Sequence, residues 1–349
     1  MNRQEILQWL READEARLEY LWQQADGIRR ERVGDEVHLR ALIELSNYCR
    51  RDCFYCGIRA SRCIERYRMS EDEVMDCARL AQRLRFGTVV LQSGEDMGLT
   101  SDLVTRLVRR IKVETGLAVT LSLGERDVEE LAEWRKAGAD RYLLKHETSD
   151  GGLFRRIRPG CDLADRLGLL RRARELGYEV GSGVMVGIPG QSYESLADDV
   201  SIFRELDLDM IGIGPFVAHP ETPLGHDRSR FMLPEGEQVP ATDLMTTKVV
   251  ALARLVCPDA NIPATTALAT VNVARGREIG LERGANVWMP DLTPLRWRRL
   301  YDIYPGKSAG LAAPVEEERR RLIAVLAAMG RMPATGAGGR QRRRPANAG

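Results

Sequence analysis

Short apolar runs alternate with longer amphipathic stretches along most of this chain. After residue 34 the short runs are rich in Val, Ile and Leu and have strand length, whereas the longer stretches repeat apolar residues at helical spacing. This alternation predicts strand–helix units, which build a parallel sheet. The eight expected strands are His38–Leu45, Thr88–Gln92, Ala118–Leu123, Arg141–Leu144, Val180–Val186, Met210–Gly214, Asn261–Ala264 and Val287–Met289.

Helices are expected between the strands, and two of them begin with a recognisable cap. Ser70 and Asp127 each stand three residues before an acid, Glu73 and Glu130, which is the pattern of a capping box. Residues 1–34 also carry apolar residues at helical spacing. The expected helices after residue 34 are 70–85, 101–115, 127–137, 162–176, 192–206, 239–256, 274–284 and 314–330.

Eight strand–helix units predict an α/β fold, a complete (β/α)8 barrel of the TIM type. The expected organisation is a helical extension at 1–34, the barrel at 35–310, a helix at 311–331 and a disordered tail at 332–349, which is rich in Gly, Ala, Arg and Pro. Chemistry in such barrels lies at the carboxyl ends of the strands. Residues that directly follow each strand are therefore the candidate site.

Composition narrows the functional classes. The 52 Lys and Arg residues balance 51 Asp and Glu residues, so charge gives no argument for nucleic acid. No apolar run approaches the ~20 residues of a membrane span, and the charged N-terminus lacks a signal-peptide core. We therefore expect a cytoplasmic protein without nucleic-acid or membrane partners. Three of the seven cysteines lie within eight residues, which indicates metal chemistry rather than disulfides.

Cys49, Cys53 and Cys56 directly follow the first expected strand with the spacing C-x3-C-x2-C. Three thiolates on one loop can each bind a different corner iron of a 4Fe–4S cluster, which leaves the fourth iron without a protein ligand. A zinc site with Cys63 as fourth ligand is the alternative. The spacing, with aromatic Tyr55 before the last cysteine, resembles the signature of radical S-adenosylmethionine (SAM) enzymes, in which this aromatic residue packs on the SAM adenine.

The second expected strand is followed by Ser93, Gly94 and Glu95. A small residue, a glycine and an acid at a strand end can offer backbone groups and a carboxylate to an ammonium group. The segment resembles the "GGE" element that holds the SAM amino group in the radical SAM family, with Ser93 in place of the first glycine.

The next strand ends supply three further candidates. Ser122 ends the third strand, and Glu147 follows the fourth, where a carboxylate suits a ribose diol because it accepts two hydrogen bonds. Arg166 opens the next helix and could hold the methionine carboxylate through a bidentate pair. With the preceding segment these residues describe a complete SAM-binding site.

Motifs over residues 36–307 resemble the HydE-type maturases of FeFe-hydrogenase, a group related to biotin synthase and methylornithine synthase. The motifs lie at 46–49, 91–96, 138–144, 146–148, 185–191, 209–216, 219–224, 263–267, 284–287, 289–290 and 304–307.

The resemblance implies one 4Fe–4S cluster and SAM, with reductive cleavage of SAM to a 5′-deoxyadenosyl radical. It implies a small anionic or organometallic substrate, a cysteine-bound iron carbonyl/cyanide precursor, and a ferredoxin or flavodoxin as reductant; other hydrogenase maturases are possible partners. The implied substrate-binding residues are Arg40, Arg141, Lys145, Met210, Thr265, Thr266, Met289, Tyr301 and Tyr304.

Two departures from the family pattern matter. No cysteine follows Cys257, so we do not expect the second cluster that some members carry. Lys145 stands where an arginine is familiar, which keeps the charge and loses the planar fork. Two other functions stay open: a radical SAM mutase or lyase that acts on an amino acid or small thiol, and a metal-binding scaffold without catalysis.

Overall fold

Parallel strands form the centre of the molecule in the computed structural model, which describes residues 1–307 and 315–341. Seven strands follow the order β6-β5-β4-β3-β2-β1-β7, and the short β8 pairs with the start of β1. From β1 to β6, neighbours in sequence are neighbours in the sheet, as helical crossovers produce. The strands are β1 Glu36–Ser46, β2 Thr88–Ser93, β3 Ala118–Ser122, β4 Arg141–Leu143, β5 Glu179–Val186, β6 Met210–Pro215, β7 Val287–Trp288 and β8 Met332–Pro333.

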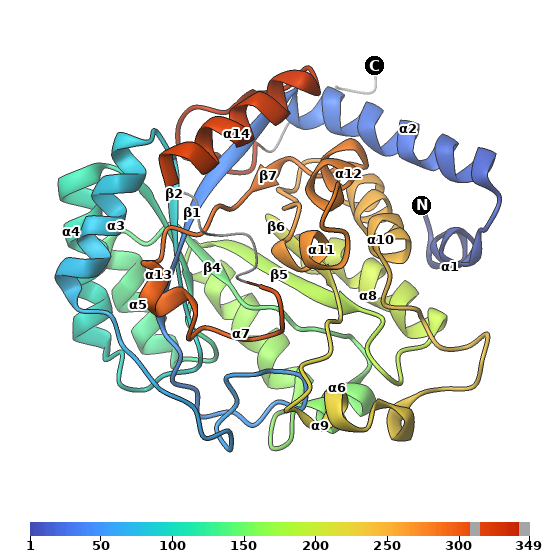
Figure 1. Ribbon diagram of the computed structural model, residues 1–349, viewed down its shortest axis with the longest axis horizontal. Helices are drawn as coiled ribbons and strands as arrows, with labels where there is room; N and C mark the ends of the chain where they lie inside the picture. Colours follow the sequence, from blue (N-terminus) through green and yellow to red (C-terminus); the bar gives the residue numbers. More distant parts are fainter. Residues whose placement is uncertain (308–314, 342–349) are drawn as a thin grey trace.

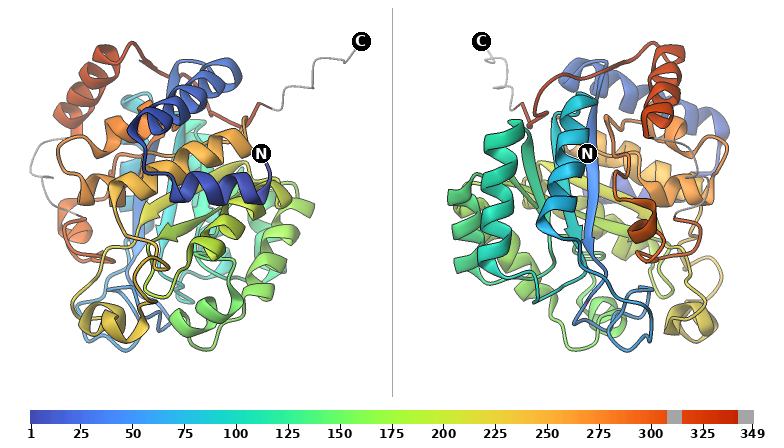
Figure 2. Two further views of the ribbon diagram at one scale, coloured as in Figure 1. Left: turned by 90° about the vertical axis from the view of Figure 1, so that its right-hand side faces the viewer. Right: turned by 60° about the vertical axis from the view of Figure 1, so that its left-hand side comes forward.

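Helices cover the outer face of these strands (Figures 1 and 2). No helix within the described ranges is long and apolar enough to cross a membrane. The α-helices are α1 Arg3–Arg11, α2 Glu15–Val33, α3 Glu71–Arg83, α4 Ser101–Thr115, α5 Val128–Ala137, α6 Gly151–Ile157, α7 Leu163–Glu175, α8 Tyr193–Glu205, α9 Pro223–His226, α10 Asp243–Val256, α11 Thr266–Val271, α12 Gly276–Glu282, α13 Leu295–Arg298 and α14 Val315–Ala328; Arg228–Phe231 form a 3₁₀ turn.

The local signals in the sequence account for several helix ends. At the start of α3, the Ser70 hydroxyl accepts from the Glu73 amide at 3.3 Å and the Glu73 carboxylate accepts from the Ser70 amide at 2.7 Å, which confirms the expected capping box. Gly116 ends α4 in the left-handed conformation, with φ of 69°. A residue with a Cβ would be strained there.

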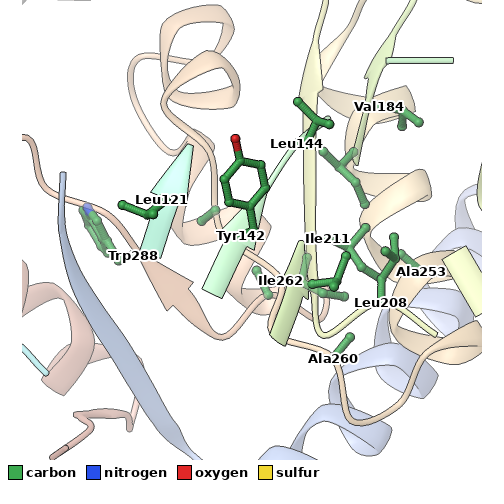
Figure 3. Close-up of a cluster of buried hydrophobic side chains, with 14 of the residues drawn as sticks. Leu121, Tyr142, Leu144, Val184, Leu208, Ile211, Ala253, Ala260, Ile262 and Trp288 are labelled. Atoms are coloured by element: carbon green, nitrogen blue, oxygen red, sulfur yellow. The ribbon is translucent and has the colours of Figure 1, made fainter. Parts of the chain in front are cut away.

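The core lies between the strands and the helices. Figure 3 shows part of it, where Leu121 of β3, Tyr142 of β4 and Ile211 of β6 contribute buried side chains. The inner strands are buried along nearly their whole length, as expected for a parallel sheet that is covered by helices. This packing fixes the register of the strand ends and therefore the position of the residues that follow them.

The expected strand Asn261–Ala264 is wrong as a strand. The segment forms only isolated bridges, from Asn261 to Met210 and from Pro263 to Val287. Pro263 has no N–H to donate, which limits pairing in a segment of four residues. The structure thus confirms the parallel α/β sheet with seven strands, but it does not show the complete eight-stranded barrel. These bridges connect β6 and β7, the two strands at the ends of the sheet.

The ends of the chain differ from expectation in detail. Residues 1–34 form two helices, α1 and α2, which pack against α8 and α10. The interruption lies where the Glu12 carboxylate accepts from the amides of Ala13 and Asp14, both at 3.0 Å.

The short helices α6, α9, α11 and α13 were not expected. The described part of the last expected helix is α14, and the division into domains stays a prediction.

The expectation of a disordered tail is wrong for residues 332–341. β8 pairs with β1, and the Gly338 carbonyl accepts from Arg40 at 3.0 Å and from Asn261 at 3.1 Å. Arg340 forms an ion pair with Asp207 at 2.7 Å. These contacts hold the segment at the amino ends of the strands. The rest of the expected tail, 342–349, and residues 308–314 of the expected barrel end and helix lie outside the described residues.

Candidate active site

A cavity of about 270 Å³ lies at the carboxyl ends of the strands. The loop after β1 forms one wall; in Figure 1 it lies at the lower edge of the molecule, near α6 and α9. The structure brings together thirteen residues that were expected in the site. They are Cys49, Cys53, Tyr55, Cys56, Ser93, Gly94, Glu95, Ser122, Lys145, Glu147, Arg166, Tyr301 and Tyr304.

The cysteine loop is fixed by a buried amide, Asn47, at the end of β1. Its Nδ2 group donates to the carbonyls of Glu65 and Leu300, both at 2.8 Å, and its Oδ1 atom accepts from the Tyr67 amide at 2.8 Å. Asn47 is fully buried. One side chain therefore ties both ends of the loop to the segment that carries the tyrosines at the far wall.

The three cysteines line the same cavity, and burial favours the neutral form of Cys53 and Cys56 unless a metal binds them. Burial raises the pKa of Cys53 to about 11 and raises that of Cys56 further. The Glu95 amide donates to Cys49 Sγ at 3.4 Å. Metal binding supplies the charge that stabilises buried thiolates. Within the described ranges no three His, Cys, Asp or Glu side chains are grouped around one ion position; a cubane cluster instead takes one thiolate at each of three separate irons. The donor set fits such a cluster.

Gly94 allows the end of β2 to approach the cysteine loop. A Cβ atom at this position would lie 2.2 Å from the Tyr48 carbonyl oxygen and 2.8 Å from Cys49 Cβ. Both distances are shorter than contact allows, so glycine is required for the loop to keep its position. The adjacent Ser93 hydroxyl donates to the Gly94 carbonyl at 2.6 Å.

Glu95 is buried and already paired. Its Oε1 atom accepts from the Nε groups of Arg50 and Arg51, both at 2.6 Å, and its Oε2 atom accepts from the Glu125 amide at 3.0 Å. The sequence predicted an acid that holds an ammonium group. The structure places that acid between two guanidinium groups at the rim of the cysteine loop.

Arg166 lines the cavity, as expected, and contacts a charge cluster that sequence reasoning missed: Arg158 also lines the cavity, and Glu125 pairs with both guanidinium groups. The Arg166 guanidinium donates to Glu125 at 2.5 Å and to the Lys145 carbonyl at 2.6 Å. Arg158 lies 3.6 Å from the same Glu125 carboxylate and donates to the Tyr55 hydroxyl at 3.0 Å. Burial opposes ionisation of Glu125, but Arg166 and the other cations hold its pKa below the ordinary value. The position of Glu125 just after β3 was the available signal.

Glu147 occupies an unusual backbone conformation, with φ of 66°. A left-handed residue with a side chain costs roughly 1–2 kcal/mol. Its carboxylate lines the cavity and lies 3.3 Å from the Lys145 ammonium group.

Tyr301 and Tyr304 line the cavity, and a buried pair of charges, Lys307 and Glu44, lies close to Tyr301. Gln92 donates to the Tyr301 hydroxyl at 3.4 Å. The Lys307 ammonium group lies 5.1 Å from the Tyr301 ring centroid and forms an ion pair with Glu44. Burial raises the pKa of Tyr304, and the nearby Glu44 adds to that effect.

Of the described residues, Arg40, Arg141 and Met210 do not line this cavity, and their role in substrate binding stays a prediction. Arg141 and Met210 are the first residues of β4 and β6, at the amino end of the sheet. Arg40 lies 2.8 Å from the Met210 sulfur, and Arg141 donates to the Ala337 carbonyl at 2.8 Å. Their distance from the carboxyl ends follows from the strand register.

The three remaining substrate candidates also lie outside the cavity lining. The Thr265 hydroxyl donates to the Ile213 carbonyl at 2.9 Å and caps α11. Thr266 and Met289 line a separate hollow with Arg277 and Lys307. A role of these residues in substrate binding stays a prediction.

Comparison with known proteins identifies the family. The radical SAM superfamily model matches residues 43–203. The [FeFe] hydrogenase maturase subunit HydE of Thermotoga maritima is 50% identical over 290 residues, which are 83% of this chain and 80% of that protein. This chain belongs to the radical SAM superfamily. It is therefore a radical SAM enzyme, and dependence on SAM and a 4Fe–4S cluster is typical of the family.

Two other relatives of this radical SAM enzyme bear on its function and fold. The 3-methylornithine synthase of Methanosarcina acetivorans is 30% identical over 275 residues, 78% of this chain and 74% of that protein. A crystal structure of methylornithine synthase superposes with a TM-score of 0.80 at 24% identity, covering 95% of this chain and 94% of that one. The superposition shows a shared fold.

Proposed function

We propose that this radical SAM enzyme acts in the assembly of the active-site cluster of FeFe-hydrogenase, as a HydE-like maturase. The observation that carries the proposal is one cavity that combines three loop cysteines with SAM-binding candidates from the ends of β2, β3 and β4. The 50% identity to the Thermotoga maritima maturase supports the hydrogenase assignment.

Cys49, Cys53 and Cys56 would hold a single 4Fe–4S cluster, and SAM would lie beside it. When bound, the two cofactors supply a one-electron cleavage of SAM that yields methionine and a 5′-deoxyadenosyl radical. In this proposal Glu147 accepts hydrogen bonds from the ribose, and Tyr55 packs on the adenine. Isolated bridges at Asn261 and Pro263 connect β6 and β7 and would limit the access of water to the site.

The charged residues of the cavity orient SAM. The segment Ser93–Glu95 offers backbone groups to the SAM ammonium group, while the Glu95 carboxylate stays paired with Arg50 and Arg51. Arg166 pairs with the SAM carboxylate. Arg166 now donates to Glu125 at 2.5 Å, so the SAM carboxylate competes with Glu125 for this guanidinium. Guanidinium–carboxylate pairs are short and directional, and this exchange therefore fixes how the methionine end of SAM lies.

The substrate would lie between Lys145, Tyr301 and Tyr304, three residues that line the cavity. One cation and two hydroxyl groups suit a small anionic or organometallic substrate. A ferredoxin or flavodoxin would deliver the electron, and other hydrogenase maturases would supply the substrate or take the product.

A maturation assay tests the proposal. Reconstituted protein is added, with SAM and a reductant, to cell-free extract that contains FeFe-hydrogenase and its other maturases but no HydE. We expect hydrogenase activity to appear, and the Cys53→Ala variant to give none. Cleavage of SAM without any gain of hydrogenase activity would contradict the maturase function and leave the radical SAM assignment intact.

The second candidate is an amino-acid mutase, favoured by the 30% identity to 3-methylornithine synthase. The same preparation is incubated with SAM, reductant and a mixture of free amino acids. Formation of 3-methylornithine, detected by mass spectrometry, would favour this candidate over the maturase.

A further inference from the structure

The loop that carries Glu147 needs support from outside the cavity. Glu147 is one of three non-glycine residues with positive φ in the described chain, and its side chain is buried at the cavity wall. On the side of β5, its amide donates to the Gly183 carbonyl at 3.0 Å and its carbonyl accepts from the Met185 amide at 3.0 Å. These bonds fix the position of Glu147 relative to β5. They do not hold the chain that follows it.

A second anchor is a carboxylate on α8. Both the amide and the hydroxyl group of Ser149, two residues after Glu147, donate to Asp199 Oδ1, the hydroxyl at 2.7 Å. Asp199 is fully buried, and α8 packs directly on β5, as Figure 1 shows. The chain on both sides of Glu147 is therefore tied, to β5 on one side and to α8 on the other.

The same carboxylate also holds the loop after β5. Its Oδ2 atom accepts from Gln191 Nε2 at 2.9 Å, and Gln191 Oε1 accepts from the Gly187 amide at 2.7 Å. The amide and hydroxyl groups of Ser149 and the Gln191 side chain thus all donate to Asp199, whose two carboxylate oxygens can accept all of these bonds. An asparagine would turn its NH₂ group toward one of these donors.

We propose that Asp199 is a positioning residue for the SAM site, which acts through Glu147. By fixing Ser149 and Gln191 it keeps the left-handed turn at Glu147 and so directs that carboxylate into the cavity. The inference rests on the proposed SAM-binding role of Glu147. Asp199 itself does not line the cavity.

The test is a double-mutant cycle on SAM affinity. The Kd of the reconstituted protein for SAM is measured by equilibrium dialysis under anaerobic conditions, for wild type, Asp199→Ala, Glu147→Ala and the double variant. We expect each single substitution to weaken SAM binding about tenfold. The double variant should bind as weakly as Glu147→Ala alone, because Asp199 has no effect once the carboxylate it positions is gone.

Asp198→Ala is the matched control. Asp198 is the preceding residue on α8, is half exposed and pairs with Arg3 at the surface; its substitution should leave the Kd unchanged. Asp199→Asn keeps one acceptor for Ser149. It replaces Asp199→Ala in the cycle if the alanine variant does not fold, and a low iron content after reconstitution would reveal that failure. We expect its Kd to lie between those of wild type and Glu147→Ala.

Each other outcome has a defined meaning. Wild-type affinity in Asp199→Ala, or in Asp199→Asn where the alanine variant does not fold, overturns the positioning role alone. Losses that multiply in the double variant indicate a general structural role and overturn it as well. A wild-type protein that does not bind SAM overturns the proposed SAM site, and the positioning role with it.

Discussion

Replacing Lys307 by methionine should destabilise the protein through one buried carboxylate. Glu44 is fully buried, and the Lys307 ammonium group forms its ion pair. The same ammonium group lies 3.5 Å from Asp291, whose other cation, Arg298, is 3.7 Å away. Methionine keeps the length of the side chain and removes the charge.

The magnitude follows from this burial. Breaking a buried ion pair by removing one partner typically costs 3–5 kcal/mol, because the remaining charge stays buried. Protonation of Glu44 limits the loss, since burial and Asp291 already raise its pKa in the intact cluster. We therefore expect a loss of about 3 kcal/mol in the free energy of unfolding near pH 8.

The loss should depend on pH with a defined sign. Without Lys307 the pKa of Glu44 rises further above its ordinary value of 4.5, so the folded variant binds the proton more tightly than the unfolded chain. The variant therefore keeps its stability below about pH 4.5, the ordinary pKa of the carboxyl group, and loses stability as pH rises above it. The difference from wild type should widen between pH 5.5 and pH 8.

Urea unfolding of the cluster-free protein at these two pH values measures the effect. Glu44→Gln combined with Lys307→Met should recover most of the loss, and Lys136→Met, at an exposed position on α5, is the control. A loss below about 1 kcal/mol at pH 8, the size of a surface pair, or a loss equal at both pH values, would refute the reasoning.

Three further predictions concern the site and the amino end of the sheet. Gly94→Ala should reduce bound iron after reconstitution, because the added Cβ would lie 2.2 Å from the Tyr48 carbonyl oxygen; Gly27→Ala, with open space around its Cβ, should bind iron as wild type does, and equal iron in both variants would contradict this account. Deleting residues from 335 onward removes the Ala337 and Gly338 carbonyls, which accept four hydrogen bonds from β1, β2, β4 and Asn261. The deletion should lower the free energy of unfolding by about 4 kcal/mol, at about 1 kcal/mol for each lost bond; an unchanged urea midpoint would show that the segment contributes nothing. Tyr301→Phe removes a hydroxyl group from the proposed substrate region of the cavity, so it should leave SAM cleavage intact and reduce activity in the maturation assay. Loss of both activities would argue against a substrate role.

The strands and the longer helices could be predicted because their apolar periodicity is strong. Asn261–Ala264 was mistaken for a strand because a short apolar run does not reveal how many of its amides find partners. The short helices after the strands lack a full period of apolar residues. The contacts of Ala337 and Gly338 depend on carbonyl groups, which every sequence has. Such backbone contacts leave no signal in the choice of side chains.

The candidate site was predictable where the residue type itself limits the chemistry, as with the cysteines and Gly94. Glu125 and Arg158 were missed because surface acids and arginines are common and only the fold shows that they meet. Arg141 and Met210 begin expected strands, so the pattern already placed them at the amino ends of the sheet. They were expected to bind substrate because of the resemblance to known relatives. The structure shows that they begin β4 and β6 and do not line the cavity.

Metal content and SAM cleavage, measured together on anaerobically reconstituted protein, test the central claim most directly. The account predicts about four irons per chain, 5′-deoxyadenosine when SAM and dithionite are supplied, and loss of that product when any one of Cys49, Cys53 and Cys56 is replaced by alanine. Zinc in place of iron, or nucleoside product retained by the cysteine variants, would contradict it.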